Sequence, residues 1–172
     1  MARTTVLLLA GAAMLATAGC AKKRPEVLPP GPGQTQPQDT GPAPDNSYGQ
    51  IRPGSPEDFR RSVTSDTIHF ALDQYDVDPE ARAILDTQAQ WLSKFPNVRI
   101  TIEGHCDERG TREYNLGLGD RRANAAKNYL AARGVSPTRI TTISYGKERP
   151  VALGSDEASW AQNRRAVTIV LN

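Results

Sequence analysis

Four residues in the middle of the chain have the types and the spacing to hold a charged ligand. Asp107 follows an apolar segment that is predicted to be a strand. Asn115 then caps a predicted helix, in which Leu118 and Arg122 lie three and seven positions further on. These offsets place all three side chains on one helix face. A carboxylate can bind an ammonium group and a guanidinium can bind a carboxylate, so the pattern indicates a site for a zwitterion.

The spacing alone leaves two interpretations of this charge pair open. Asp107 and Arg122 either bind a ligand or pair with each other across the turn. If they bind a ligand, each charge-assisted hydrogen bond contributes about 1.5–3 kcal/mol. After the cost of association, two or three such bonds predict an affinity of roughly micromolar class.

The same stretch does not indicate an enzyme, a metal site or a cofactor. His105, Cys106 and Asp107 are residue types that bind metals, but neighbouring residues on a strand point to opposite faces. No second cluster completes a tetrahedral set, and no third group orients a Cys–His pair. The balance of basic and acidic residues also argues against nucleic acid as a partner. Lys and Arg number 21 against 19 Asp and Glu, which is too balanced to predict nucleic acid as the main partner.

Alternating and helical apolar patterns predict the elements that position these residues. Ile68, Phe70 and Leu72 share one face of a first strand, and Asp78-Pro79 is a strong helix start. The predicted order is a strand at 67–72, a helix at 79–95, a strand at 98–102, a helix at 116–133 ended by Gly134, a strand at 140–145, a short helix at 156–162 and a strand at 167–171. This order predicts an α/β sandwich, with a four-stranded sheet that carries helices on one face and is partly solvated on the other. Trp91 and Trp160 are expected at the edges of elements.

The N-terminal segment is typical of a secretory signal over residues 1–19. A basic start precedes an apolar run at 6–18, which is shorter than the roughly 20 residues that span a bilayer. Ala18-Gly19-Cys20 resembles the lipobox of bacterial lipoproteins, although Thr17 stands where that motif usually has Leu. The resemblance implies that Cys20 is acylated, and Ala21 fits retention in the outer membrane. A Cys20–Cys106 disulfide is the alternative.

Proline and glycine dominate the segment that follows. Residues 20–56 hold few apolar side chains, so the acylated N-terminus is expected to continue as a disordered linker. Fully extended, the linker would reach about 120 Å. The folded domain is then expected to occupy residues 57–172, which is long enough to bury its own core.

The run GHCDERGTREYNLGLGDRRANAAKNYL resembles the OmpA-like peptidoglycan-binding domain family. HFALDQYDVDPEA, ISYGKERP and NRRAVTIV agree with it, so the likeness covers roughly residues 65–172. Together with the lipobox and linker, these motifs are similar to the family's lipoprotein members of the Tol-Pal system. Cys106 departs from them, because a small apolar residue is usual there, and it leaves an oxidisable thiol beside the site.

The resemblance assigns the ligand. It implies that Asp107 and Arg122 grip the zwitterionic end of diaminopimelate in the peptidoglycan stem peptide. The other implied binding residues are Asn115, Leu118, Phe70 and Arg165. The implied function is a non-catalytic tether between outer membrane and cell wall that supports envelope integrity and outer-membrane constriction at division. TolB and other Tol proteins are the implied partners, and the alternative is a TolB-binding module with little direct wall binding.

Overall fold

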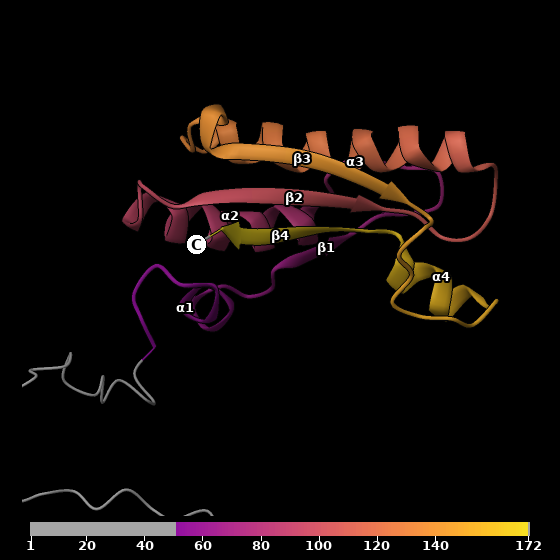
Figure 1. The fold of residues 1–172 in the computed structure, drawn as a ribbon, viewed down its shortest axis with the longest axis horizontal. Helices are drawn as coiled ribbons and strands as arrows, with labels where there is room; N and C mark the ends of the chain where they lie inside the picture. Colours follow the sequence, from indigo (N-terminus) through magenta and orange to yellow (C-terminus); the bar gives the residue numbers. More distant parts are fainter. Residues whose placement is uncertain (1–50, 172) are drawn as a thin grey trace, which may run out of the picture. The chain divides into compact units, whose positions relative to one another are not determined.

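The computed structural model describes residues 51–171, which form one four-stranded sheet with helices (Figure 1). Within this range, none of the helices combines the length and the apolarity needed to cross a bilayer. The elements are α1 (Pro56–Ser62), β1 (Thr67–His69), α2 (Pro79–Lys94), β2 (Arg99–His105), α3 (Arg112–Ala132), the short 3-10 helix η1 (Pro137–Arg139), β3 (Ile140–Gly146), α4 (Glu157–Asn163) and β4 (Arg165–Leu171).

The sheet has the order β1-β4-β2-β3 and is mixed. β2 runs parallel to β3 and antiparallel to β4, which is also antiparallel to β1. The two long helices α2 and α3 lie on the same side of this sheet (Figure 1). The opposite face is partly solvated, as Ile143 shows with 39% of its surface exposed. The predicted fold class, a mixed four-stranded sheet with helices packed on one face, is confirmed.

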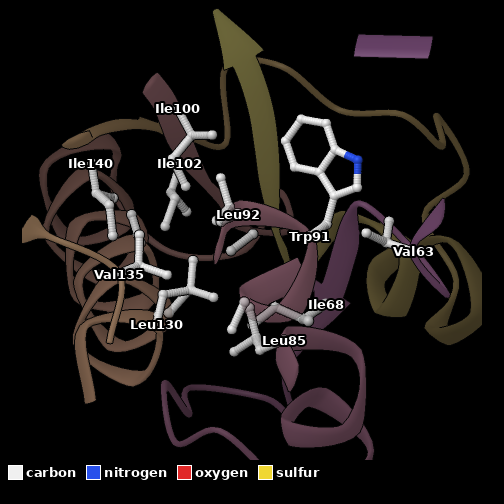
Figure 2. Packing of buried hydrophobic residues seen from close by; sticks show 14 of the residues in the cluster. Val63, Ile68, Leu85, Trp91, Leu92, Ile100, Ile102, Leu130, Val135 and Ile140 are labelled. Atoms are coloured by element: carbon white, nitrogen blue, oxygen red, sulfur yellow. The ribbon is translucent and has the colours of Figure 1, made fainter. Parts of the chain in front are cut away.

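Apolar side chains from α2, α3 and β2 fill the space between the helices and the sheet. Figure 2 shows Leu92 of α2, Leu130 of α3 and Ile100 of β2 meeting in this layer, and all three are fully buried. Removing such side chains from water contributes about 1.5–3 kcal/mol each. Trp91 is also buried and packs on Phe59 with ring centroids 5.0 Å apart, so our prediction that it lies at an element edge is wrong.

The two long helices begin and end at sequence signals. Asp78 caps α2 by accepting a hydrogen bond from the Ala81 amide, as predicted, and the helix ends at Lys94. The start of α3 was predicted wrongly. It begins at Arg112 and its N-cap is Thr111, so Asn115 is already one turn inside the helix. Gly134 follows the last turn with a φ of +95°, the left-handed conformation in which glycine commonly ends a helix.

Two glycines bring α3 unusually close to β2. A Cβ on Gly104 would lie 1.8 Å from the carbonyl oxygen of Gly119, so only a hydrogen atom fits there. The contact sets the first turns of α3 directly over the end of β2. It therefore fixes the distance between Asp107, just beyond β2, and the helix face that carries Arg122.

Three features of the structure were not expected from the sequence. The helix α1 was not predicted, and it begins at Pro56, one residue before the expected domain boundary. β1 ends at His69, so Phe70 lies beyond it and Leu72, 49% exposed, does not join the core face. In β4 the buried face carries Ala166, Thr168 and Val170. Val167 lies on the outer face, and on the buried face Thr168 donates a hydrogen bond to buried Gln88.

Candidate functional site

A cavity of about 290 Å³ opens where β2 ends and α3 begins. Its wall also includes the segment after β1 and the C-cap of α4. The lining residues are Leu72, Asp73, Cys106, Asp107, Arg109, Gly110, Tyr114, Asn115, Leu118, Arg122 and Arg164. Four of the six predicted binding residues therefore lie together, because the three helix residues share one face of α3 and that face lies over the end of β2.

Asp107 supplies the only carboxylate that is buried in this wall among the described residues, with 5% of its surface exposed. It does not pair with Arg122. Its Oδ2 accepts a hydrogen bond from Nη2 of Arg109 at 2.6 Å and one from Nη1 of Arg164 at 3.4 Å. Burial alone would raise the pKa of Asp107, but the hydrogen bonds from Arg109 outweigh burial and hold that pKa below its usual range. The carboxylate is therefore ionised at neutral pH.

Arg122 is fully buried and holds three backbone carbonyls. Its Nη1 donates to His105 at 2.9 Å, its Nε donates to Gln74 at 2.9 Å, and its Nη2 donates to Ala71 at 3.1 Å. A guanidinium has five N–H groups, so two do not donate to these carbonyls. Arg122 thus connects α3 to the end of β2 and to the segment that follows β1. It is therefore a structural residue, whatever it binds.

A ring of alternating charges lies at the mouth of the cavity. Arg109 and Arg164 both contact Asp107, and both also contact Glu157 of α4, at 3.8 Å and 2.8 Å. Arg164 is held further by donating from its Nε to the Phe70 carbonyl at 3.0 Å. The sequence analysis missed Arg109 and Arg164. The Asn163-Arg164-Arg165 motif contains Arg164 and the predicted Arg165, and of these two only Arg164 lines the cavity.

The remaining predicted residues take different places. Leu118 lines the cavity, and Asn115 holds the turn before α3 by donating to the carbonyls of Arg109 and Thr111. Phe70 and Arg165 lie outside the wall. The ring of Phe70 packs against the guanidinium of Arg122, whose Cζ lies 5.2 Å from the ring centroid. Arg165 begins β4 and donates to two backbone carbonyls, those of Asn163 and Arg149.

Comparison with known proteins identifies the family of this chain. The pattern of the OmpA family matches residues 69–164. A protein of Rhizobium meliloti named peptidoglycan-associated lipoprotein is 57% identical over 122 residues, covering 71% of this chain and 69% of its own length. A protein of the same name from Agrobacterium fabrum is 48% identical and covers 91% of this chain and 82% of its own length. This chain belongs to the OmpA family, among the peptidoglycan-associated lipoproteins.

Solved structures agree with this membership. The peptidoglycan-associated lipoprotein of Burkholderia pseudomallei is 47% identical and matches with a TM-score of 0.61, over 62% of this chain and 91% of that one. The C-terminal domain of Helicobacter pylori MotB matches with a TM-score of 0.58 at 21% identity, over 62% of this chain and 84% of its own, and that likeness concerns the fold alone. The family resemblance drawn from the sequence motifs is therefore confirmed.

Cys106 lines the cavity of this OmpA-family domain without being exposed to bulk water. It is 3% exposed, and its Sγ lies 3.3 Å from the Asn115 carbonyl, to which it donates. Burial raises the pKa of the thiol, so it stays protonated at neutral pH and is a poor nucleophile. Cys20, the other cysteine and the predicted acylation site, lies outside the described residues.

Proposed function

We propose that the chain is a non-catalytic lipoprotein of the cell envelope that binds peptidoglycan and tethers the outer membrane to the wall as part of the Tol-Pal system. In this role it supports envelope integrity and outer-membrane constriction at division. The observation that carries the proposal is a cavity with one buried carboxylate among guanidinium groups, in a chain whose relatives are named peptidoglycan-associated lipoproteins.

The proposed ligand is the zwitterionic end of diaminopimelate in the stem peptide. Its ammonium would bind the ionised carboxylate of Asp107, which is buried and therefore poorly screened by water. Its carboxylate would bind N–H groups of Arg122, which lines the same cavity. Binding of both charges together favours a zwitterion over a simple amine or a simple acid.

The proposed membrane anchor is an acylated Cys20 in the outer membrane. Its support is the lipobox-like Ala18-Gly19-Cys20 sequence and the name that the relatives carry. Two or more acyl chains hold a protein stably at a membrane, whereas one chain binds only marginally. Mass spectrometry of the protein isolated from envelopes is expected to find a diacylglycerol-type modification on Cys20. An unmodified Cys20, or a disulfide to Cys106, would refute the anchor.

Sedimentation with purified peptidoglycan sacculi tests the binding site. Residues 21–172 are compared as wild type, Asp107→Asn and Asp120→Asn, where Asp120 is an exposed residue of α3 outside the cavity wall. Losing one charge-assisted bond costs about 1.5–3 kcal/mol. Asp107→Asn should therefore bind at least about tenfold more weakly, whereas Asp120→Asn should pellet like wild type.

Each other outcome points to a definite alternative. Equal pelleting of all three proteins, with circular dichroism showing each one folded, would place the wall contact away from Asp107. Wild type that stays in solution would refute wall binding and favour a module that binds TolB, which remains a prediction of the family resemblance. Arg122 is unsuitable for this test, because its replacement also removes three structural hydrogen bonds.

A further inference from the structure

The carboxylate that the proposed function assigns to an ammonium group is already occupied by a cation of the same chain. Arg109 donates to Asp107 from Nη2 at 2.6 Å and from Nε at 3.2 Å, which is the bidentate geometry of a strong ion pair. Its backbone N–H donates to the same carboxylate at 3.1 Å. An incoming ammonium group must therefore compete with the Arg109 guanidinium for Asp107.

The two arginines on Asp107 differ in how firmly they are held. The side chain of Arg164 is 8% exposed and also donates to the Phe70 carbonyl and to Glu157, so it cannot leave without breaking buried bonds. The side chain of Arg109 is 34% exposed, and its only other polar side-chain contact among the described residues is Glu157 at 3.8 Å. Arg109 is therefore the partner that a ligand can displace.

A place for the displaced guanidinium already exists on α4. The centre of the Arg109 guanidinium lies 4.0 Å from the ring centroid of Trp160, and the carboxylate of Glu157 is beside it. Trp160 is fixed in turn by donating from its indole N–H to Glu108 at 2.9 Å. A guanidinium that leaves Asp107 can keep the aromatic face and pair with Glu157, so displacement costs less than exposing the charge to water.

We propose that Arg109 is an internal competitor that occupies the ammonium subsite of the cavity, and that it leaves Asp107 when ligand binds, stays on the face of Trp160 and pairs with Glu157. This inference rests on the proposed function, since it concerns the same site. Its consequence is selectivity. A simple amine gains only the contact with Asp107, and the free energy of displacing Arg109 offsets that gain. A zwitterion also gains the contact with Arg122.

Binding of meso-diaminopimelate to residues 21–172, measured by isothermal titration calorimetry, tests the proposal. The variant is Arg109→Gln and the matched control is Arg112→Gln. The side chain of Arg112 is 62% exposed and pairs with Glu148 outside the cavity. Arg112→Gln therefore removes the same charge as Arg109→Gln, three residues away. A partly exposed ion pair of this kind is worth up to about fivefold in binding. Arg109→Gln is therefore expected to bind about two- to fivefold more tightly than wild type, and Arg112→Gln is expected to match wild type.

A second readout follows Arg109 directly. In wild type, the 15Nε–H signal of Arg109 should shift when diaminopimelate is added, and the Asp107→Asn variant should show no such shift. If wild type binds and Arg109→Gln binds equally or more weakly, the proposal that Arg109 competes with ligand is refuted. The proposed wall-binding function is not affected by that result. Absence of binding in both wild type and Arg109→Gln overturns the ammonium site itself, and the competitor with it.

Discussion

Replacing Arg122 by methionine should destabilise the whole domain. The side chain is fully buried and its guanidinium donates to the carbonyls of Ala71, Gln74 and His105. Bonds from a charged donor are worth about 1.5–3 kcal/mol each. Their sum overstates the loss, because keeping the charge buried is itself costly, and burial lowers the pKa of Arg122 accordingly. Replacing the guanidinium leaves three carbonyls without this donor, and each buried acceptor left unpaired costs about 1–3 kcal/mol, so a loss of at least about 3 kcal/mol is expected for Arg122→Met.

Urea denaturation of residues 21–172 at neutral pH, followed by circular dichroism, measures this loss. The control is Arg121→Met, since Arg121 is exposed and its described side-chain contact is the Tyr75 ring, 5.6 Å away. That change should alter the free energy of unfolding by less than about 1 kcal/mol. If Arg122→Met costs no more than Arg121→Met, the three carbonyls do not depend on the guanidinium, and the structural role assigned to Arg122 is refuted.

Three further changes test the fold and the site. Gly104→Ala should lower the free energy of unfolding by at least about 2 kcal/mol, because the new Cβ meets the Gly119 carbonyl. Gly117→Ala, whose Cβ has only a flexible side chain within 4 Å, should be neutral or stabilise by up to about 1 kcal/mol, and equal effects would contradict the close contact. Burial, with help from two nearby arginines, lowers the pKa of His105 from 6.5 to about 4. Because the unfolded chain gains this proton first, stability should fall by about 3 kcal/mol between pH 6.5 and 4, and a His105→Gln variant should lose that slope in urea denaturation at stepped pH. Cys106→Ala should keep both the melting temperature, within a few degrees, and sedimentation with sacculi, and a large loss of either would reveal a role for the thiol.

Local sequence signals predicted the elements wherever they coincide with the tertiary structure. Asp78-Pro79 begins α2, and the alternation around Ile100 and Ile102 lies within β2 with both residues buried. The helix α1 was not predicted because only one of its seven residues, Phe59, is buried, so its apolar pattern is too short to recognise. The start of α3 was misplaced because Thr111 and Asn115 are both good caps, and the surrounding contacts decide which one serves.

The residues of the cavity also divide into those that local sequence signals predicted and those that only the tertiary structure brings together. Helix spacing brought Asn115, Leu118 and Arg122 together, since it depends only on positions within one element. Arg109 and Arg164 reach Asp107 from a turn and from the end of α4, and their meeting depends on how the chain folds between them. No local pattern carries that information. The question left open by the sequence, whether Asp107 and Arg122 pair with each other, is decided by their different partners.

The distribution of contacts explains how one site can combine a rigid frame with selective entry. Arg122 and Arg164 are fixed by backbone carbonyls, so the positions of their charges are set by the fold before any ligand arrives. Arg109 reaches buried Asp107 from a partly exposed side chain, so it can leave this carboxylate more easily than the buried Arg164 can. A ligand that replaces one cation by another on Asp107 gains less than it would gain at a carboxylate with no partner. Only a ligand whose second charge reaches Arg122 obtains a net advantage, which is why a zwitterion suits this cavity better than either of its halves.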